Sequence, residues 1–252
     1  MILRVSETTV TEQLTSGWDS FAQSQKVGAR ASAYVSQPAH ARLAGTLAAS
    51  LLPQAFGHLP EEVIEAIRQH DTGWSAPDLA ALEMAPGDAP ISFLDVPSTR
   101  ATSAWRRSIR EAQQRSSLQA VLISRHFCLL SPHDGDPAHE LFTREEIEVR
   151  EPIERACGLQ EQELDRYTAA LGFCDLVSLL MCSGIAGDFE LPVAHPAHPQ
   201  ARNAPRTVCT LRHGAVGFDG PMLTAGVTLS AWIWTRGPSG SIENDRCTWI
   251  AE

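Results

Sequence analysis

Residues 162–184 read QELDRYTAALGFCDLVSLLMCSG, and this stretch decides the fold. Its leucines and aromatic residues recur every three to four positions, and Gly184 stands where a helix would end. The pattern therefore predicts a long helix with a buried face. Asp175 lies in its middle, where an ionised carboxylate is unfavourable unless a positive group pairs with it. A metal ion would supply that charge, and so would an arginine such as Arg42 or Arg68.

Further helices are predicted on the N-terminal side of this one. Residues 39–52, AHARLAGTLAASLL, place Ala and Leu at helical spacing and stop before a proline. Residues 61–71, EEVIEAIRQHD, follow a proline and open with two acidic residues, which favours a second helix. Two more helices are predicted over residues 102–115 and 143–158, separated by the apolar segment 118–130 and an acidic loop.

The remaining segments lack a helical period. Residues 1–30 are polar, so we expect a loose arm or a short strand there. Residues 75–98 are rich in proline and are interpreted as a long loop. After residue 191 the chain becomes rich in β-forming residues separated by glycine-containing turns, which predicts a small antiparallel sheet. We therefore divide the chain into a helical metal-binding domain over residues 1–190 and a small β-rich extension over residues 191–252 that packs on it.

Composition narrows the class of partner. The net charge is -10, and an acidic protein repels a phosphate backbone, so we expect no nucleic acid as partner. No apolar run reaches membrane-spanning length and the first residues do not resemble a signal peptide, so we expect no membrane association and a cytoplasmic protein. The six cysteines form no CxxC pair, which favours free thiols. A small molecule is the expected substrate.

Three places in the sequence carry residues that bind transition metals. His40 begins the helix over residues 39–52, the pair His70-Asp71 ends the next helix, and Asp175 lies in the long helix. Taken singly, His40 is explained as a polar first-turn residue and the pair His70-Asp71 as a cap and turn. Imidazole and carboxylate groups that converge from rigid helices are, however, what a divalent transition metal requires. The combination predicts a metal site built from these four residues.

The local sequences QPAHARLAG, AIRQHDTGW, ISFLDVP, AWRRSI, LISRHFCLL and LGFCDLVSLLMC resemble the family known as domain of unknown function 3891, over most of residues 34–185. The order His, His-Asp, Asp more loosely resembles the HD-domain superfamily of metal-dependent phosphohydrolases. That resemblance implies a mostly α fold, an HD-domain-like helical bundle with a small C-terminal β-rich extension. It also implies that His40, His70, Asp71 and Asp175 ligate the metal, with Asp71 able to bridge to a second ion.

The chain departs from the two-metal members of that superfamily, which bring further histidines between the His-Asp pair and the last Asp. Only His126 stands in a comparable apolar setting here. We interpret His133 and His139, in the acidic loop, as surface residues, and His195 and His198, in a proline-rich linker, as solvated. A single divalent transition metal ion (iron, manganese, nickel, cobalt or zinc) is therefore expected rather than two.

Five residues around the cluster are candidates to bind the substrate. Arginine side chains can orient a phosphate group, and a tryptophan can wall a pocket or stack on a ring. Each residue has an alternative explanation as a surface salt bridge or a packed aromatic. The candidates are Gln37, Arg42, Trp74, Arg106 and Arg125.

Three functions fit these features. The first is hydrolysis of a phosphate ester or nucleotide-like small molecule, with Asp71 and His126 as the catalytic residues beside a metal ion that acidifies water. The second is an HD-type diiron oxygenase in which His126 is itself a ligand. The third is a binding or sensor domain with a vestigial metal site. The sequence leaves the oligomeric state open, a homodimer included.

Overall fold

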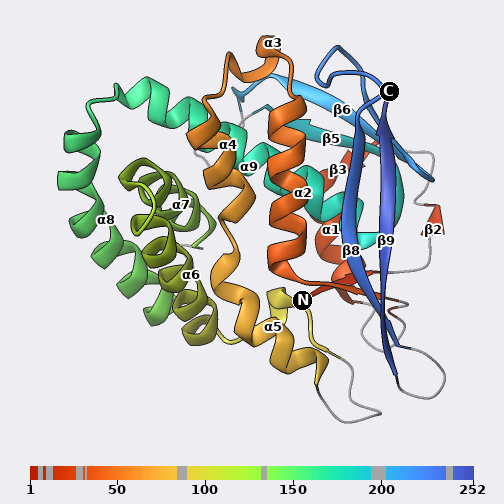
Figure 1. The fold of residues 1–252 in the computed structure, drawn as a ribbon, viewed down its shortest axis with the longest axis horizontal. Helices are drawn as coiled ribbons and strands as arrows, with labels where there is room; N and C mark the ends of the chain where they lie inside the picture. Colours follow the sequence, from red (N-terminus) through yellow and green to blue (C-terminus); the bar gives the residue numbers. More distant parts are fainter. Residues whose placement is uncertain are drawn as a thin grey trace.

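The structure, a computed structural model, describes residues 1–4, 8–9, 14–26, 31, 33–83, 90–131, 135–193, 203–236 and 241–252. Most of its helices gather on one side of the molecule and its strands on the other, with α1 on the strand side (Figure 1). The helices are α1 (Gly17–Ser24), α2 (Gln37–Ser50), α3 (Pro53–Phe56), α4 (Glu61–Gln69), α5 (Ser75–Leu82), α6 (Ser98–Gln113), α7 (Ser117–Leu130), α8 (Pro137–Cys157) and α9 (Glu161–Ser183). Short 3-10 helices lie at Thr72–Trp74 and Phe93–Asp95.

The strands form one mixed sheet. They are β1 (Ile2–Arg4), β2 (Thr8–Thr9), β3 (Thr15–Ser16), β4 (Ala33–Val35), β5 (Ile185–Pro192), β6 (Arg206–Arg212), β7 (Ala215–Phe218), β8 (Thr228–Arg236) and β9 (Ile242–Ala251). The order across the sheet is β1-β4-β8-β9-β7-β6-β5-β2, and β3 also pairs with β5. Neighbours are antiparallel except where β9 meets β7 and where β5 meets β2 and β3.

The expected fold class, an HD-domain-like helical bundle with a small C-terminal β-rich extension, is wrong. The sheet takes strands from both ends of the chain: Ile2 in β1 is opposite Val35 in β4, and Tyr34 in β4 is opposite Trp234 in β8. The expected antiparallel sheet is also wrong, because β7 and β9 run parallel. The N-terminal strands are two or three residues long, too short to show the two-residue alternation by which a strand is recognised.

Helix α9 is the centre of the core, and its prediction from residues 162–184 is confirmed to within one residue at each end. Residues 170–183 are all buried, on every side of the helix. One side contacts α2, α4 and α7, and the other contacts α1, β1 and β5. A helix that packs against other helices and also against a sheet must be apolar around its whole circumference, as α9 is over this stretch. Because α2 also packs on β8, the sheet holds in place two of the helices that carry candidate ligands.

Two segments expected to lack helices contain them. Residues 75–98 were expected to form a long loop, but α5 continues directly from the 3-10 helix at Thr72–Trp74. Pro77 falls in its first turn, where proline is tolerated, and Leu82 packs against Tyr34 and Leu3. Helix α1 lies within the first thirty residues, where only a strand or arm was expected; its N-cap is Ser16.

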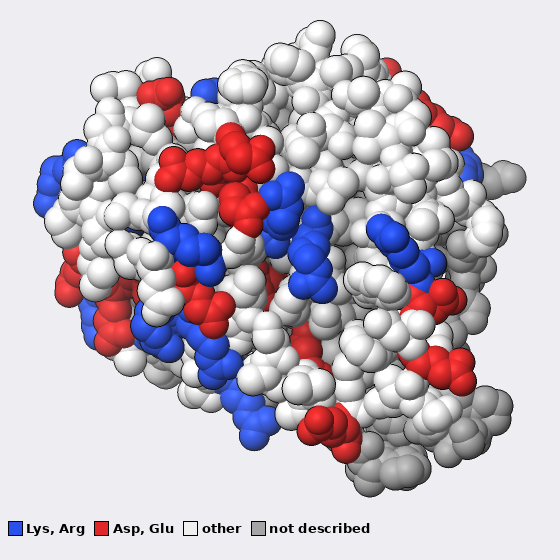
Figure 2. Space-filling model, viewed as in Figure 1, with Lys and Arg blue, Asp and Glu red and all other residues white. Residues whose placement is uncertain are grey.

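Acidic and basic side chains interleave over the helical half of the face seen in Figure 2, whereas much of the sheet side is uncharged. The net charge of -10 is therefore not gathered into one patch on this face. Among the described residues, no helix combines the length and the apolar character that crossing a membrane requires.

A close approach between α2 and α4 sets the distance between two parts of the cluster, and it depends on Gly45. A Cβ atom at this position would lie 2.7 Å from the Cα of Arg68 in α4. Helix propensity alone favours alanine over glycine by about 1 kcal/mol. We expect Gly45→Ala to lower the free energy of unfolding instead, by about 1–3 kcal/mol, because the two helices must separate.

Denaturant unfolding of purified protein measures this change. Ala49→Gly, at an exposed position of the same helix, is the matched control and is expected to cost about 1 kcal/mol from propensity alone. A Gly45→Ala protein more stable than the parent would contradict the packing argument.

Candidate metal centre

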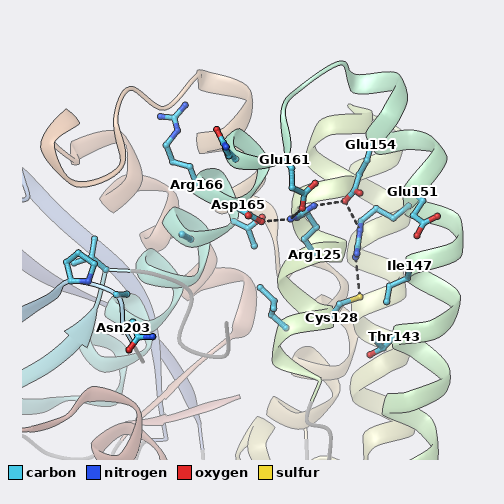
Figure 3. A pocket seen from close by; sticks show the side chains of 18 residues that line it. Arg125, Cys128, Thr143, Ile147, Glu151, Glu154, Glu161, Asp165, Arg166 and Asn203 are labelled. Atoms are coloured by element: carbon cyan, nitrogen blue, oxygen red, sulfur yellow. Dashed lines mark hydrogen bonds and ion pairs between the residues drawn. The ribbon is translucent and has the colours of Figure 1, made fainter. Parts of the chain in front are cut away.

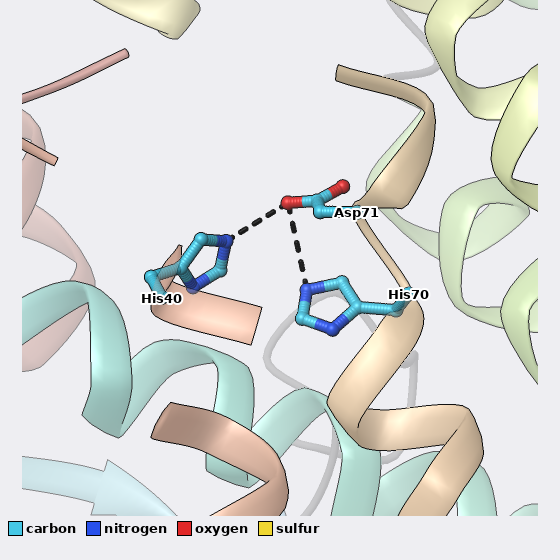
Figure 4. Close-up of side chains that lie close together, drawn as sticks. All are labelled: His40, His70 and Asp71. Atoms are coloured by element: carbon cyan, nitrogen blue, oxygen red, sulfur yellow. Dashed lines mark hydrogen bonds and ion pairs between the residues drawn. The ribbon is translucent and has the colours of Figure 1, made fainter. Parts of the chain in front are cut away.

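Five buried side chains from four helical segments meet in the core. His40 comes from α2, His70 and Asp71 from the end of α4, His126 from α7 and Asp175 from α9. Their exposed fractions lie between 0% and 7%. Figure 4 shows His40 and His70 converging on the carboxylate of Asp71. Three of these residues are histidines and two are carboxylates, which is a donor set that suits a divalent transition metal.

The start of α2 places His40. Ser36 caps the helix by accepting the backbone N–H of Ala39 at 3.3 Å, and Pro38 lies in the first turn. The backbone N–H of Gln37 donates to the buried Asp78 carboxylate at 2.5 Å. Caps and first-turn prolines are the usual means by which a sequence fixes a helix start. His40 is therefore held one turn into a rigid helix, with its ring pointing inward.

The end of α4 places the pair His70-Asp71. His70 keeps helical backbone angles, while Asp71 turns away with φ -109° and ψ 21°. The chain then packs tightly on α6: the N–H of Gly73 donates to Ser108 Oγ at 2.9 Å. A Cβ atom on Gly73 would lie 2.6 Å from the backbone nitrogen of Ser108, so only glycine allows this approach. The approach locks the turn in which Asp71 sits.

The five side chains form two overlapping groups. His40, His70 and Asp71 make one, and His70, His126 and Asp175 make the other; within each group the candidate ligand atoms lie within 4.8 Å of one another. His40 Nε2 is 2.8 Å from Asp71 Oδ2. His70 Nε2 is 3.3 Å from Asp175 Oδ1 and 3.5 Å from Asp71 Oδ2. His126 Nε2 is 3.6 Å from Asp175 Oδ2.

Hydrogen bonds behind the cluster fix which nitrogen of each ring faces it. Ser178 Oγ donates its proton to the Asp175 carbonyl oxygen at 2.8 Å, so it can only accept from His40 Nδ1, which lies 2.9 Å away. His70 Nδ1 donates to the Ile67 carbonyl oxygen at 2.8 Å. A neutral imidazole carries one proton, so both rings direct the lone pair of Nε2 at the carboxylates. Histidine ligands of metals are oriented in the same way, by a hydrogen bond from the ring nitrogen that does not face the ion.

Lone pairs and carboxylates that face one another in a buried site need a cation or added protons between them. Although burial by itself lowers the pKa of His70, the charges of Asp71 and Asp175 raise that pKa to about 9. Burial alone would raise the pKa of Asp175, but the neighbouring His70, His126 and His40 hold it well below its usual range. The cluster can therefore be held together by added protons, one of them on His70, or by a metal ion that uses the Nε2 atoms of His40 and His70.

The structure brings together the four residues expected to ligate metal, and His126 with them. Asp175 is compensated by histidines and not by Arg42 or Arg68, the alternative that the sequence left open: Arg42 is exposed on α2, and Arg68 pairs with Glu61 and Glu65. The histidines rather than an arginine surround this carboxylate.

The three arginines expected to bind substrate lie away from the cluster. Arg106 pairs with Glu145 at 2.6 Å. Arg125 pairs with Glu154, Glu161 and Asp165 in a separate surface cleft of about 950 Å³, shown in Figure 3. Arg42 does not line this cleft or the cavity that adjoins the cluster. Arg106 and Arg125 therefore belong to surface ion pairs, which is the alternative explanation given for them.

Gln37 and Trp74 do adjoin the cluster, since both line a cavity that also reaches Asp71, His126 and Asp175.

Sequence reasoning missed Ser178 and the cavity walls. Ser178 lies one turn after Asp175 on α9, so its position on the same helix face was available from spacing. The walls come from segments far apart in the sequence, and no local pattern indicates that they meet.

The other histidines of the sequence fall into two sets. His139 was expected to be solvated in an acidic loop, but α8 already begins at Pro137, and its ring stacks on Trp105 with centroids 5.7 Å apart. His133, His195 and His198 lie outside the described residues.

The fold and the cluster define an α+β protein with a buried His/Asp centre suited to a divalent transition metal. The chain belongs to the family described as protein of unknown function (DUF3891), whose sequence profile matches residues 26–219. This confirms the resemblance seen in the local sequences. Neither a curated protein nor a solved structure matches the chain.

The hydrogen bond between Ser178 and His40 gives a direct test of the centre. We expect Ser178→Ala to weaken binding of a divalent transition metal by about 10- to 100-fold, because His40 loses the acceptor that fixes its tautomer. Competition with a metal-sensitive dye measures the affinity.

Ser183→Ala is the matched control. Ser183 is buried on the same helix and donates to the carbonyl three residues back, at 2.7 Å, yet it does not contact a histidine of the cluster. Equal losses of metal affinity in the two variants would show that the effect is one of helix stability.

Proposed function

We propose that the protein is a metal-dependent hydrolase that acts on a phosphate ester of a small molecule. The observation that carries this proposal is the set of imidazole nitrogens and carboxylate oxygens that face one another in the core with their outer hydrogen bonds already made. Such a set needs added protons or a cation, and a divalent metal ion is the cation that these ligand types suit. His40, His70, Asp71 and Asp175 would hold the ion, in the order that resembles HD-domain phosphohydrolases.

A divalent transition ion supplies Lewis acidity, which lowers the pKa of water to near neutrality and polarises a phosphoryl oxygen. The chain's own residues do the rest. Asp71 borders both the cluster and the adjoining cavity, so its carboxylate is placed to accept a proton from a nucleophile that enters between them. His126 borders the same cavity and is placed to contact the substrate's oxygen atoms. The buried setting excludes bulk water around both groups.

A second candidate, an HD-type diiron oxygenase, is favoured by one specific observation. His70 belongs to both groups of potential ligands, and His126 completes the second group together with Asp175. Two neighbouring ions could divide these residues between them, with His70 on one ion only, because its single Nε2 lone pair cannot bind both, and with a carboxylate as the bridge. We place hydrolysis first because the described cluster offers five side chains, whereas two ions that each keep an open position need more protein ligands than that.

Metal content is the first expected outcome. We expect the parent to bind one equivalent of divalent transition metal, His70→Ala to bind much less, and Asp175→Asn to bind none, because each change removes a ligand from the centre. Elemental analysis after dialysis measures it. His58→Ala, at an exposed loop position, is the control and should keep its metal. Parent protein that takes up no metal under any loading condition rules the proposal out.

Turnover is the second expected outcome. We expect the metal-loaded protein to cleave p-nitrophenyl esters of phosphate, to lose this activity with a chelator and to regain it with metal, while Asp71→Asn keeps less than about 1% of the rate. The release of p-nitrophenol measures it. Loaded protein inactive on both the monoester and the diester would contradict hydrolysis of phosphate esters.

His126 separates hydrolase from oxygenase. In the hydrolase it contacts substrate, so His126→Ala should lower turnover and leave the single metal equivalent in place. In the oxygenase it ligates iron, so the same change must remove one of two iron equivalents. Iron stoichiometry of the parent and the variant after anaerobic loading decides between the two.

A further inference from the structure

A cavity of about 290 Å³ adjoins the cluster, and its chemistry differs sharply from that of the cluster itself. Asp71, His126 and Asp175 form one end. The rest is mainly aromatic and aliphatic, with walls that include Trp18, Trp74, Phe93, Trp105, Phe127 and Leu179. Among the described residues that line it, there is no lysine and no arginine. An apolar pocket with a few polar groups at one end is the usual form of a small-molecule site.

Two polar side chains that line the apolar part, Gln37 and His139, each have a buried nitrogen without a hydrogen-bond partner in the described structure, and Gln37 is the more deeply buried. Gln37 is 1% exposed and lines the cavity, and its side-chain Nε2 has no hydrogen-bond acceptor within the described structure. Its backbone is fixed by Asp78, so the amide is not free to turn to solvent. A buried amide N–H2 group without an acceptor is unfavourable. An acceptor atom on a ligand in the cavity would satisfy it.

The cavity also has an apolar entrance. Trp18 and Leu94 line it and are each 39% exposed. Large apolar side chains kept at a surface beside a deep pocket are typical of a binding site. A packing defect inside the core would have no open rim.

We propose that this cavity binds the non-reacting part of the substrate, and that this part is an uncharged, ring-sized apolar group with one acceptor atom for Gln37. The reacting group then points to the cluster. The proposal rests on the proposed function for the role of the cluster, but binding in the cavity does not require the metal. A volume near the lower end of small-molecule sites, roughly 300 Å³, suits one or two rings. Without a lysine or an arginine among its described lining residues, the cavity disfavours a polyphosphate chain.

Benzamide and acetamide test the cavity directly, because both offer a carbonyl acceptor and only benzamide has a ring. With protein treated with a chelator, we expect benzamide to bind about tenfold more tightly than acetamide, since the ring is removed from water. Chemical-shift titration of the tryptophan indole signals measures both affinities. Val96→Phe, at a half-buried position of the wall, should abolish the difference by filling the cavity.

Gln37→Met keeps the length of the side chain and removes the amide, so benzamide binding should weaken about fivefold while binding of toluene is unchanged. Gln119→Met is the matched control, because Gln119 is also buried with a side-chain oxygen that lacks a partner, but does not line the cavity. Thermal unfolding of each variant verifies its fold. Equal affinity for benzamide and acetamide, or equal losses from the two glutamine variants, would overturn the inference.

The same experiment separates the two proposals. If the protein takes up no metal but binds benzamide as expected, the cavity inference stands and the hydrolase proposal fails. If it takes up metal but does not distinguish benzamide from acetamide, the metal centre stands and the cavity inference fails. Inorganic phosphate, added as a competitor to metal-free protein, should leave benzamide binding unchanged, and displacement of benzamide by phosphate would count against an uncharged ligand.

Discussion

A carboxylate in the middle of a fully buried helix is the constraint on which the rest of the site depends. Asp175 lies within a fourteen-residue stretch, residues 170–183, that is buried throughout, so water does not compensate its charge. Its neighbours on α2, α4 and α7 are histidines. Histidine is the one side chain that can meet such a carboxylate either as a cation or as a neutral partner that shares a metal. Because the neighbours of Asp175 are histidines, the centre can bind a metal ion without any change of residue.

The scaffold explains why the histidines keep their positions. Helix α9 packs between the other helices and the sheet, and α2 is held against β8. The cluster is thus built on helices rather than on loops, with a glycine at each of two close contacts, α2 to α4 and the His70-Asp71 turn to α6. Sites on packed helices tolerate little displacement, because the side chains that support them interdigitate. This rigidity suits metal ligands, which must stay within a few tenths of an ångström of their places.

The sequence allowed the long helices and the residues of the cluster to be predicted, but not the short helices α1 and α5 or the pairing of the sheet. Residues 39–52, 61–71 and 162–184 repeat apolar residues over three or more turns, and this is a local signal. The strands near the N-terminus have two or three residues, and β4 places Tyr34 opposite Trp234 at the other end of the chain. The pairing of these strands is therefore decided by the whole chain. The same reason applies to the cavity walls. Arg106 and Arg125 are cases in which the local sequence misled: it suggested that these arginines bind phosphate. In the structure their charges are instead paired with the carboxylates of surface glutamates.

The charge of the centre links the number of ions to the charge of the substrate. Two carboxylates and three neutral imidazoles carry a charge of about -2, which one divalent ion cancels. A neutral centre beside a cavity without lysine or arginine among its described lining residues offers nothing to offset the second negative charge of a phosphate monoester. A phosphodiester, with a single negative charge, is desolvated at lower cost. A second ion, bound through His126 and the Asp175 carboxylate, would instead leave a net positive centre that favours a dianion. The protein's preference for phosphate monoesters or diesters as substrates therefore indicates the number of bound ions: one ion favours diesters and two ions favour monoesters.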